Sequence, residues 1–164
     1  MTPKDVFWSW DFLAALGSSL LLAFLVPAGI SVSFAKDLFG VGISVLSIVF
    51  SVFFAALAII ISASDNDFVV FLEEEGHYTA IIQTFKVSLL ALFVALIYSL
   101  VLYAFTAAAA SAFVQGQHWL WFCVFVFLFL YGLFSAFNSA LDAIRYAQTR
   151  ASYLSVRTKS DRQV

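Results

Sequence analysis

Charged side chains are scarce in this sequence of 164 residues, because Asp, Glu, Lys and Arg together make up only 11% of it. Water-soluble domains carry about 25% charged residues, so this composition is not that of a soluble protein. Four stretches contain none of these residues, and each is long enough to cross a bilayer, which takes about 20 residues. They cover residues 12–35, 38–64, 87–112 and 118–141. We predict that each is a helix, since backbone inside lipid must satisfy its own hydrogen bonds.

The sequence also lacks the residue groups on which most catalytic and metal sites depend. Cys123 is its only cysteine, and its two histidines, His77 and His118, are expected on opposite sides of the membrane. No HExxH, G-x-S-x-G or Gly-rich phosphate loop is present. We therefore expect no enzymatic activity, no cofactor and no metal. A nucleic-acid partner is not expected either, since only a short basic tail would favour one.

Basic residues are distributed unevenly between the two sides of the expected bundle. Lys36 is the only one of the eight on one side, which leaves seven for the side with both termini and the 65–86 loop. Cytoplasmic segments are enriched in Lys and Arg, so we place both termini in the cytoplasm and the protein in the plasma (inner) membrane. The predicted fold is an all-α, four-helix transmembrane bundle over residues 1–146. A basic helical tail over 142–164 is expected to continue the fourth helix, because it contains no Gly or Pro.

The connection between the first two predicted spans is very short. The sequence KDLFG, residues 36–40, supplies the only charges between them. This shortness predicts that the first two helices are antiparallel neighbours. Pro27 is expected to kink the first of them, because proline removes a backbone donor and clashes with the preceding turn.

Small residues recur along the second span at steps of three or four. They are Gly40, Ser44, Ser47, Ser51, Ala55, Ala58 and Ser62. At about 100° per residue all seven fall on one side of a helix, which we call the small-residue face. Either another helix packs closely against this face, or it lines a pore in which serine hydroxyls replace water around an ion. A shorter small face on the fourth span is a candidate mate for it and consists of Gly132, Ala136 and Ala140.

Half of the ten acidic residues lie in one segment between the second and third spans. They are Asp65, Asp67, Glu73, Glu74 and Glu75. We expect the 65–78 loop to form a short cytoplasmic helix that is capped by Asp65 or Asp67 and ends at Gly76. Three glutamates at a helix C-terminus oppose the helix dipole, so helix propensity does not explain them.

Three interpretations of this acidic cluster stay open. The loop helix lies at the membrane interface with its carboxylates in water, or the carboxylates bind a divalent cation, although their spacing matches no EF-hand loop. In the third interpretation they pair with basic residues of the tail, across subunits of an oligomer. These tail residues are Arg145, Arg150, Arg157, Lys159 and Arg162. The arginines have a competing partner in anionic lipid headgroups.

The absence of any ionisable side chain within the spans disfavours proton- or ion-coupled transport. A channel needs no such group, because backbone and hydroxyl oxygens can conduct ions. Together with the small-residue face, this leads us to predict a homo-oligomeric, channel- or pore-like protein in the lipid bilayer. The alternative is a non-conducting accessory or immunity-type protein that binds another membrane protein through its Phe-rich surface or its acidic loop.

Overall fold

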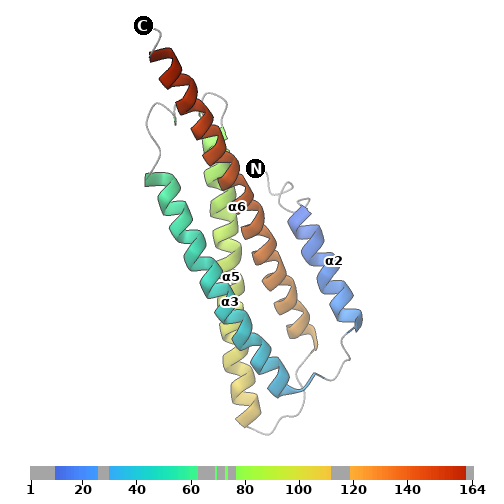
Figure 1. Cartoon of the computed structure of the whole chain (residues 1–164). Helices are drawn as coiled ribbons and strands as arrows, with labels where there is room; N and C mark the ends of the chain where they lie inside the picture. Colours follow the sequence, from blue (N-terminus) through green and yellow to red (C-terminus); the bar gives the residue numbers. More distant parts are fainter. Residues whose placement is uncertain are drawn as a thin grey trace.

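A computed structural model describes residues 10–25, 30–62, 69, 73, 77–111 and 119–161. Within these residues the chain is all-helical and forms four helices (Figure 1). They are α2 (Trp10–Leu25), α3 (Val32–Ser62), α5 (His77–Ser111) and α6 (Trp119–Asp161). Successive helices alternate in direction, so the start of α2, the end of α3, the start of α5 and the end of α6 point the same way (Figure 1).

Three of these helices, α3, α5 and α6, are long and apolar enough to cross a membrane. Helix α2 has 16 residues and is about 24 Å long at 1.5 Å per residue, whereas the hydrocarbon core of a bilayer is about 30 Å thick. The expected span over 12–35 is therefore divided. Helix α2 ends at Leu25, two residues before a proline that disfavours helical backbone, and residues 32–35 already belong to α3. Pro27, where a kink was predicted, lies outside the described residues.

Helices α5 and α6 form the centre of the bundle. Helix α3 packs mainly on α5 and also on α6, whereas α2 packs along α6. The prediction that the first two helices are neighbours is wrong, because residues 36–40 are not a turn but part of α3. Helix α2 is held instead by Phe12, whose ring meets Phe127 and Tyr131 of α6 edge-on at centroid distances of 5.5 and 6.0 Å. The Asn138 amide of α6 also donates a hydrogen bond to the Asp11 carboxylate.

The core consists of ring and aliphatic side chains between α3, α5 and α6. Near the start of α3, Phe39 packs edge-on against Phe125 of α6, with the ring centroids 4.7 Å apart. Nearer its end, Phe53 stacks on Phe85 of α5 at a centroid distance of 4.8 Å. Gly42 is buried under Phe125, and a Cβ atom there would lie only 2.7 Å from the ring. The close approach of α3 and α6 therefore depends on this glycine.

Three serine hydroxyls form a buried cluster between α5 and α6. Ser88 Oγ lies 2.7 Å from Ser135 Oγ and 2.6 Å from Ser139 Oγ, and it donates to the Ser135 carbonyl oxygen at 3.1 Å as an alternative. All three side chains are buried, with at most 5% exposed. Hydroxyls of this kind connect membrane helices, so the cluster fixes the register of α5 against α6. The spacing of Ser135 and Ser139 by four residues was the only sign of it in the sequence.

We expect Ser88→Ala to lower the free energy of unfolding of the protomer by about 1 kcal/mol, because Ser135 and Ser139 then lose their common partner. Reversible unfolding in mixed detergent micelles, followed by circular dichroism, measures this loss. Ser44→Ala is the control, since the exposed Ser44 hydroxyl donates only to the Gly40 carbonyl of its own helix, at 3.0 Å. Equal losses in the two variants would contradict a stabilising role for the cluster.

Candidate functional site

The small-residue face of α3 points away from the core of the protomer. Gly40 and Ser47 are half-buried, and the exposed members are Ser44, Ser51, Ala55 and Ala58. The buried residues of the same helix, among them Phe39, Leu46 and Phe53, lie on its opposite side. Of Ser62, only its place at the end of α3 is described. The small-residue face is therefore not a packing seam within the protomer.

The short small face of α6 does not pair with it, as the sequence suggested it would. Gly132 is buried against α5, where a Cβ atom would lie 3.4 Å from Leu92 Cδ2 and 3.7 Å from Leu92 Cα. Ala136 is buried in the same cluster as Leu92 and Phe85, whereas Ala140 is exposed. Large side chains of α5 fill the space that these small residues leave, so the partner of the α6 face is α5.

The first part of the small-residue face is hollowed. The hollow has a volume of about 460 Å³ and begins at Lys36 and Asp37. The Tyr103 ring of α5 lines it too and stands beside Gly40, at 3.6 Å from where a Cβ atom would be. The other lining residues belong to α3 and are Gly40, Val41, Ser44, Val45 and Ile48. The hollow thus exists because Gly40 and Ser44, which lie one turn apart, add little side-chain volume between the larger residues around them.

The serine hydroxyls on this face are bonded to the backbone of their own helix. Ser44 Oγ donates to the Gly40 carbonyl at 3.0 Å, and Ser51 Oγ donates to the Ser47 carbonyl at 2.8 Å. A hydroxyl has a single proton and two acceptor lone pairs. Since the proton is engaged with the backbone, each of these groups presents acceptor oxygen to its surroundings. Such a surface suits a hydrogen-bond donor or a cation.

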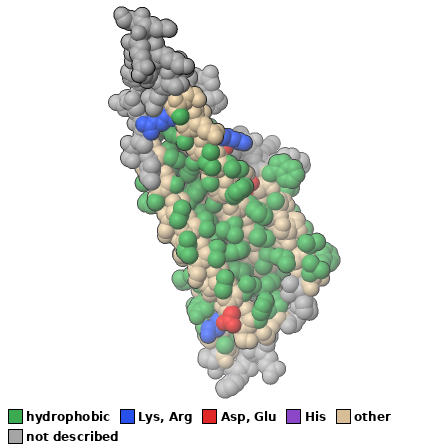
Figure 2. Space-filling model, viewed as in Figure 1, with side chains coloured by type: hydrophobic (Ala, Val, Ile, Leu, Met, Phe, Trp, Pro, Cys, Tyr) green, Lys and Arg blue, Asp and Glu red, His purple; other side chains and the backbone are tan. Residues whose placement is uncertain are grey.

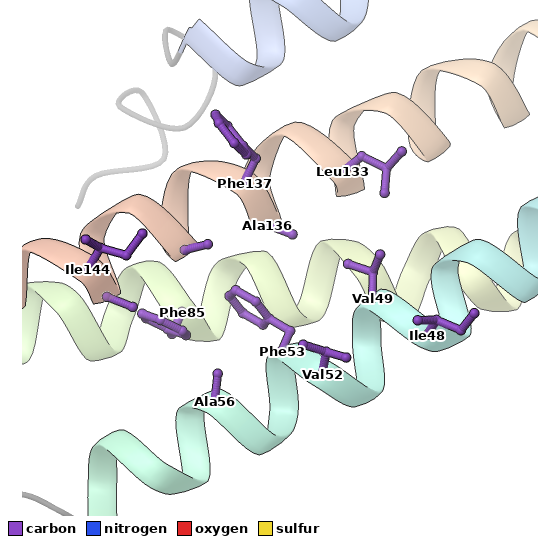
Figure 3. Close-up of a pocket in the computed structure, with 12 residues that line it drawn as sticks. Ile48, Val49, Val52, Phe53, Ala56, Phe85, Leu133, Ala136, Phe137 and Ile144 are labelled. Atoms are coloured by element: carbon purple, nitrogen blue, oxygen red, sulfur yellow. The ribbon is translucent and has the colours of Figure 1, made fainter. Parts of the chain in front are cut away.

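A second surface feature is an apolar groove between α3 and α6, with a volume of about 480 Å³ (Figure 3). Its floor contains one buried side chain from each of α3, α5 and α6: Phe53, Phe85 and Ala136. Exposed apolar side chains form its rims: Ile48 and Val52 of α3, and Phe137 and Ile144 of α6. Figure 2 shows hydrophobic side chains over most of this view of the molecule, with charged side chains toward its two ends. This groove suits a lipid chain or an apolar helix.

Glu73 is the member of the predicted acidic cluster that the structure describes, whereas Asp65, Asp67, Glu74 and Glu75 lie outside the described residues. Its carboxylate accepts hydrogen bonds from the Thr79 backbone N–H at 3.1 Å and from the Thr79 hydroxyl at 2.7 Å. Thr79 lies in the first turn of α5, where backbone N–H groups need partners and the helix dipole favours negative charge. This glutamate therefore stabilises the start of the following helix.

The basic residues of the predicted tail lie on α6 as far as the structure describes them. The exposed Arg145 forms an ion pair with Asp142, with a 3.3 Å distance between Nη1 and Oδ1. Arg150 is half-buried, and Arg157 and Lys159 belong to the last turns of α6. The side chains of Arg157 and Lys159, and all of Arg162, are outside the described part. Pairing of the tail with the acidic cluster across subunits stays a prediction.

Two surfaces thus face away from the core, the small-residue face of α3 and the groove between α3 and α6. Within the described residues, no group of three or more His, Cys, Asp or Glu is placed to hold a metal ion. Comparison of the chain with models of protein families, with curated proteins and with solved structures finds no match.

Proposed function

We propose that the protein is a homo-oligomeric, channel-like integral membrane protein in which the small-residue face of α3 lies nearest the axis of the assembly. The observation that carries this proposal is the outward direction of that face, opposite the core of the protomer. Faces made of Gly, Ala and Ser let membrane helices approach closely. A face of this kind that is not used inside the protomer is available to further copies of the chain.

The chemistry of the face favours cations as the conducted species. The Ser44 and Ser51 hydroxyls donate to their own helix and present acceptor oxygen outward. Rings of such oxygens replace part of the hydration shell of a permeating cation. Anions need hydrogen-bond donors, and the single O–H group of each of these serines already donates to a backbone carbonyl.

We propose that the chain crosses the plasma (inner) membrane four times, with both termini on its cytoplasmic side. The basis of this arrangement is the distribution of Lys and Arg, seven against one. Helix α6 has 43 residues, or about 65 Å at 1.5 Å per residue, roughly twice the thickness of the hydrocarbon core. We place its final turns, which include Arg150 and Arg157, in the cytoplasm. The short α2 is accommodated by its packing along α6 and by local thinning of the bilayer.

The substitution Ala55→Leu tests this proposal. It adds bulk to an exposed position in the middle of the small-residue face, so we expect cation flux into liposomes to fall to the background level of protein-free vesicles. Ala104→Leu is the matched control, because Ala104 is exposed on α5, a helix that does not carry the small-residue face. The control is expected to conduct like the original protein.

Two outcomes would overturn the proposal. One is a mass in mild detergent that corresponds to a single chain. The other is flux that responds equally to Ala55→Leu and Ala104→Leu. Circular dichroism of both variants shows whether either change disturbs the protomer itself.

The accessory-protein alternative is favoured by the apolar groove between α3 and α6, whose exposed rims fit an apolar helix of another membrane protein. Ala140→Phe narrows the groove and is expected to reduce co-purification of a stoichiometric partner. Ala147→Phe, at an exposed position of α6 outside the groove lining, is the control. If no partner co-purifies in a fixed ratio, this alternative fails.

A further inference from the structure

Lys36 and Asp37 lie at the two opposite edges of the small-residue face, at its beginning. Counting about 100° per residue, the face extends from about 20° on one side of Gly40, at Ser47, to about 60° on the other, at Ala55. Lys36 lies about 40° from Gly40 on the Ser47 side, and Asp37 lies about 60° from it on the Ala55 side. Both line the hollow at the start of this face. An adjoining basic and acidic patch is visible near the lower end of Figure 2, over the first turns of α3. The face is thus flanked by one positive and one negative charge.

These two charges do not neutralise each other within one chain. Consecutive residues of a helix point in different directions and do not face each other. Among the residues that the structure describes, neither Lys36 nor Asp37 has an ion-pair partner. Both lie in the first turns of a helix that is long and apolar enough to cross a membrane, just before its charge-free part begins at Leu38.

We propose that neighbouring copies of the chain meet in parallel through the small-residue face, with Lys36 of one copy paired with Asp37 of the next. This inference rests on the proposed assembly through that face and adds its contact and register. All copies insert in the same orientation, so equal residues lie at equal depth in the membrane. A rotation axis along the membrane normal then places the Lys36 side of each face opposite the Asp37 side of its neighbour.

The hollow makes this pairing compatible with close packing. Gly40 and Ser44 have so little volume that the neighbouring α3 can approach the helix backbone. The flexible Lys36 side chain can then span the gap to a carboxylate on the neighbouring helix. The same flanking arrangement serves a two-fold dimer and a larger ring, because every copy offers one charge to each side.

Charge exchange is the direct test. Lys36→Asp and Asp37→Lys each place like charges opposite one another, and each is expected to weaken self-association by about tenfold. The double exchange Lys36→Asp with Asp37→Lys restores the pairing with reversed sense and is expected to recover most of the original affinity. The measurement is the oligomer fraction against protein concentration in mild detergent, by light scattering. Lys86→Asp on α5 is the matched control, since Lys86 is exposed and far from this face in the sequence.

The outcomes separate this inference from the proposed function. Weak association in both single variants and recovery in the double variant support the pairing. If neither single reversal changes association while Ala55→Leu abolishes it, assembly through the face stands and the Lys36–Asp37 contact is overturned. If Lys36→Asp alone has an effect and added anionic lipid strengthens association of the original protein, the lysine binds a lipid headgroup and the contact is again overturned. A protein that is monomeric at every concentration overturns both proposals.

Discussion

A leucine in place of Gly42 is expected to prevent α3 from packing against α6. A Cβ atom at this position would lie 2.7 Å from Cζ and 2.9 Å from Cε2 of Phe125. The Phe125 ring cannot move aside, because it is 3% exposed and lies between Phe39, at 4.7 Å, and Phe129, at 5.8 Å between centroids. Overpacking by single methylene groups already costs about 1–3 kcal/mol, so a whole leucine side chain should cost at least about 3 kcal/mol.

Gly17→Leu is the matched control for this prediction. A Cβ atom at Gly17 would meet nothing within 4 Å, and both substitutions gain similarly in helix propensity, by up to about 1 kcal/mol. Unfolding in mixed micelles should therefore show Gly17→Leu as neutral or slightly stabilised. If Gly42→Leu yields no folded protein, the smaller change Gly42→Ala gives a measurable loss. Equal stabilities at positions 17 and 42 would contradict the close packing of α3 on α6.

Phe85→Ala is expected to remove a fully buried aromatic ring from the other half of the core. The Phe85 ring is fully buried and stacks on Phe53 with a centroid distance of 4.8 Å and an interplanar angle of 20°. Truncation of buried aromatic residues costs about 3–5 kcal/mol in soluble proteins. In a membrane the ring moves into lipid rather than water when the helices separate, so the loss is one of packing. We therefore expect about 3 kcal/mol, the lower end of that range.

The same substitution at Phe105 provides the comparison for Phe85. Phe105 lies on the same helix and is 71% exposed, so its ring has few protein contacts to lose. Its replacement by alanine should change the free energy of unfolding by no more than about 0.5 kcal/mol. Both variants are compared by thermal and detergent-induced unfolding under identical lipid conditions. A loss at Phe105 as large as that at Phe85 would show that the bundle does not pack around Phe85 as described.

The existence of the long helices could be predicted from the sequence, but their ends could not. Charge-free stretches marked the apolar part of each helix, and the predicted spans began at residues 38 and 87. The helices begin earlier, at Val32 and His77, and continue through Lys36, Asp37 and Lys86. A charged side chain marks where a helix leaves the apolar layer and does not end it, because an exposed side chain can extend from a helix into water. The end of α2 at Leu25 could not be predicted, because the charge-free stretch continues past it to residue 35.

The small-residue face could be predicted from the spacing of its residues. Whether it points into the protomer or away from it could not. A soluble helix marks its outer side with polar residues, but α3 is apolar all round and offers only small residues on one side and large ones on the other. The small-residue face points outward because Phe39, Leu46 and Phe53, on the other side of α3, pack into the core. The serine cluster was missed for a related reason: Ser88 and Ser135 are 47 residues apart, and only the packing of α5 on α6 brings them together.

The pairing of α2 with α6 has a consequence for the order in which this protein matures. The two residues joined by their hydrogen bond, Asp11 and Asn138, are 127 positions apart. At a synthesis rate of roughly 5–20 residues per second, the ribosome needs roughly 6 to 25 s to progress from one to the other. During that interval α3 and α5 can already pack together, whereas α2 still lacks the helix on which it packs. Helix α2 can therefore reach its place in the bundle only after translation has produced α6.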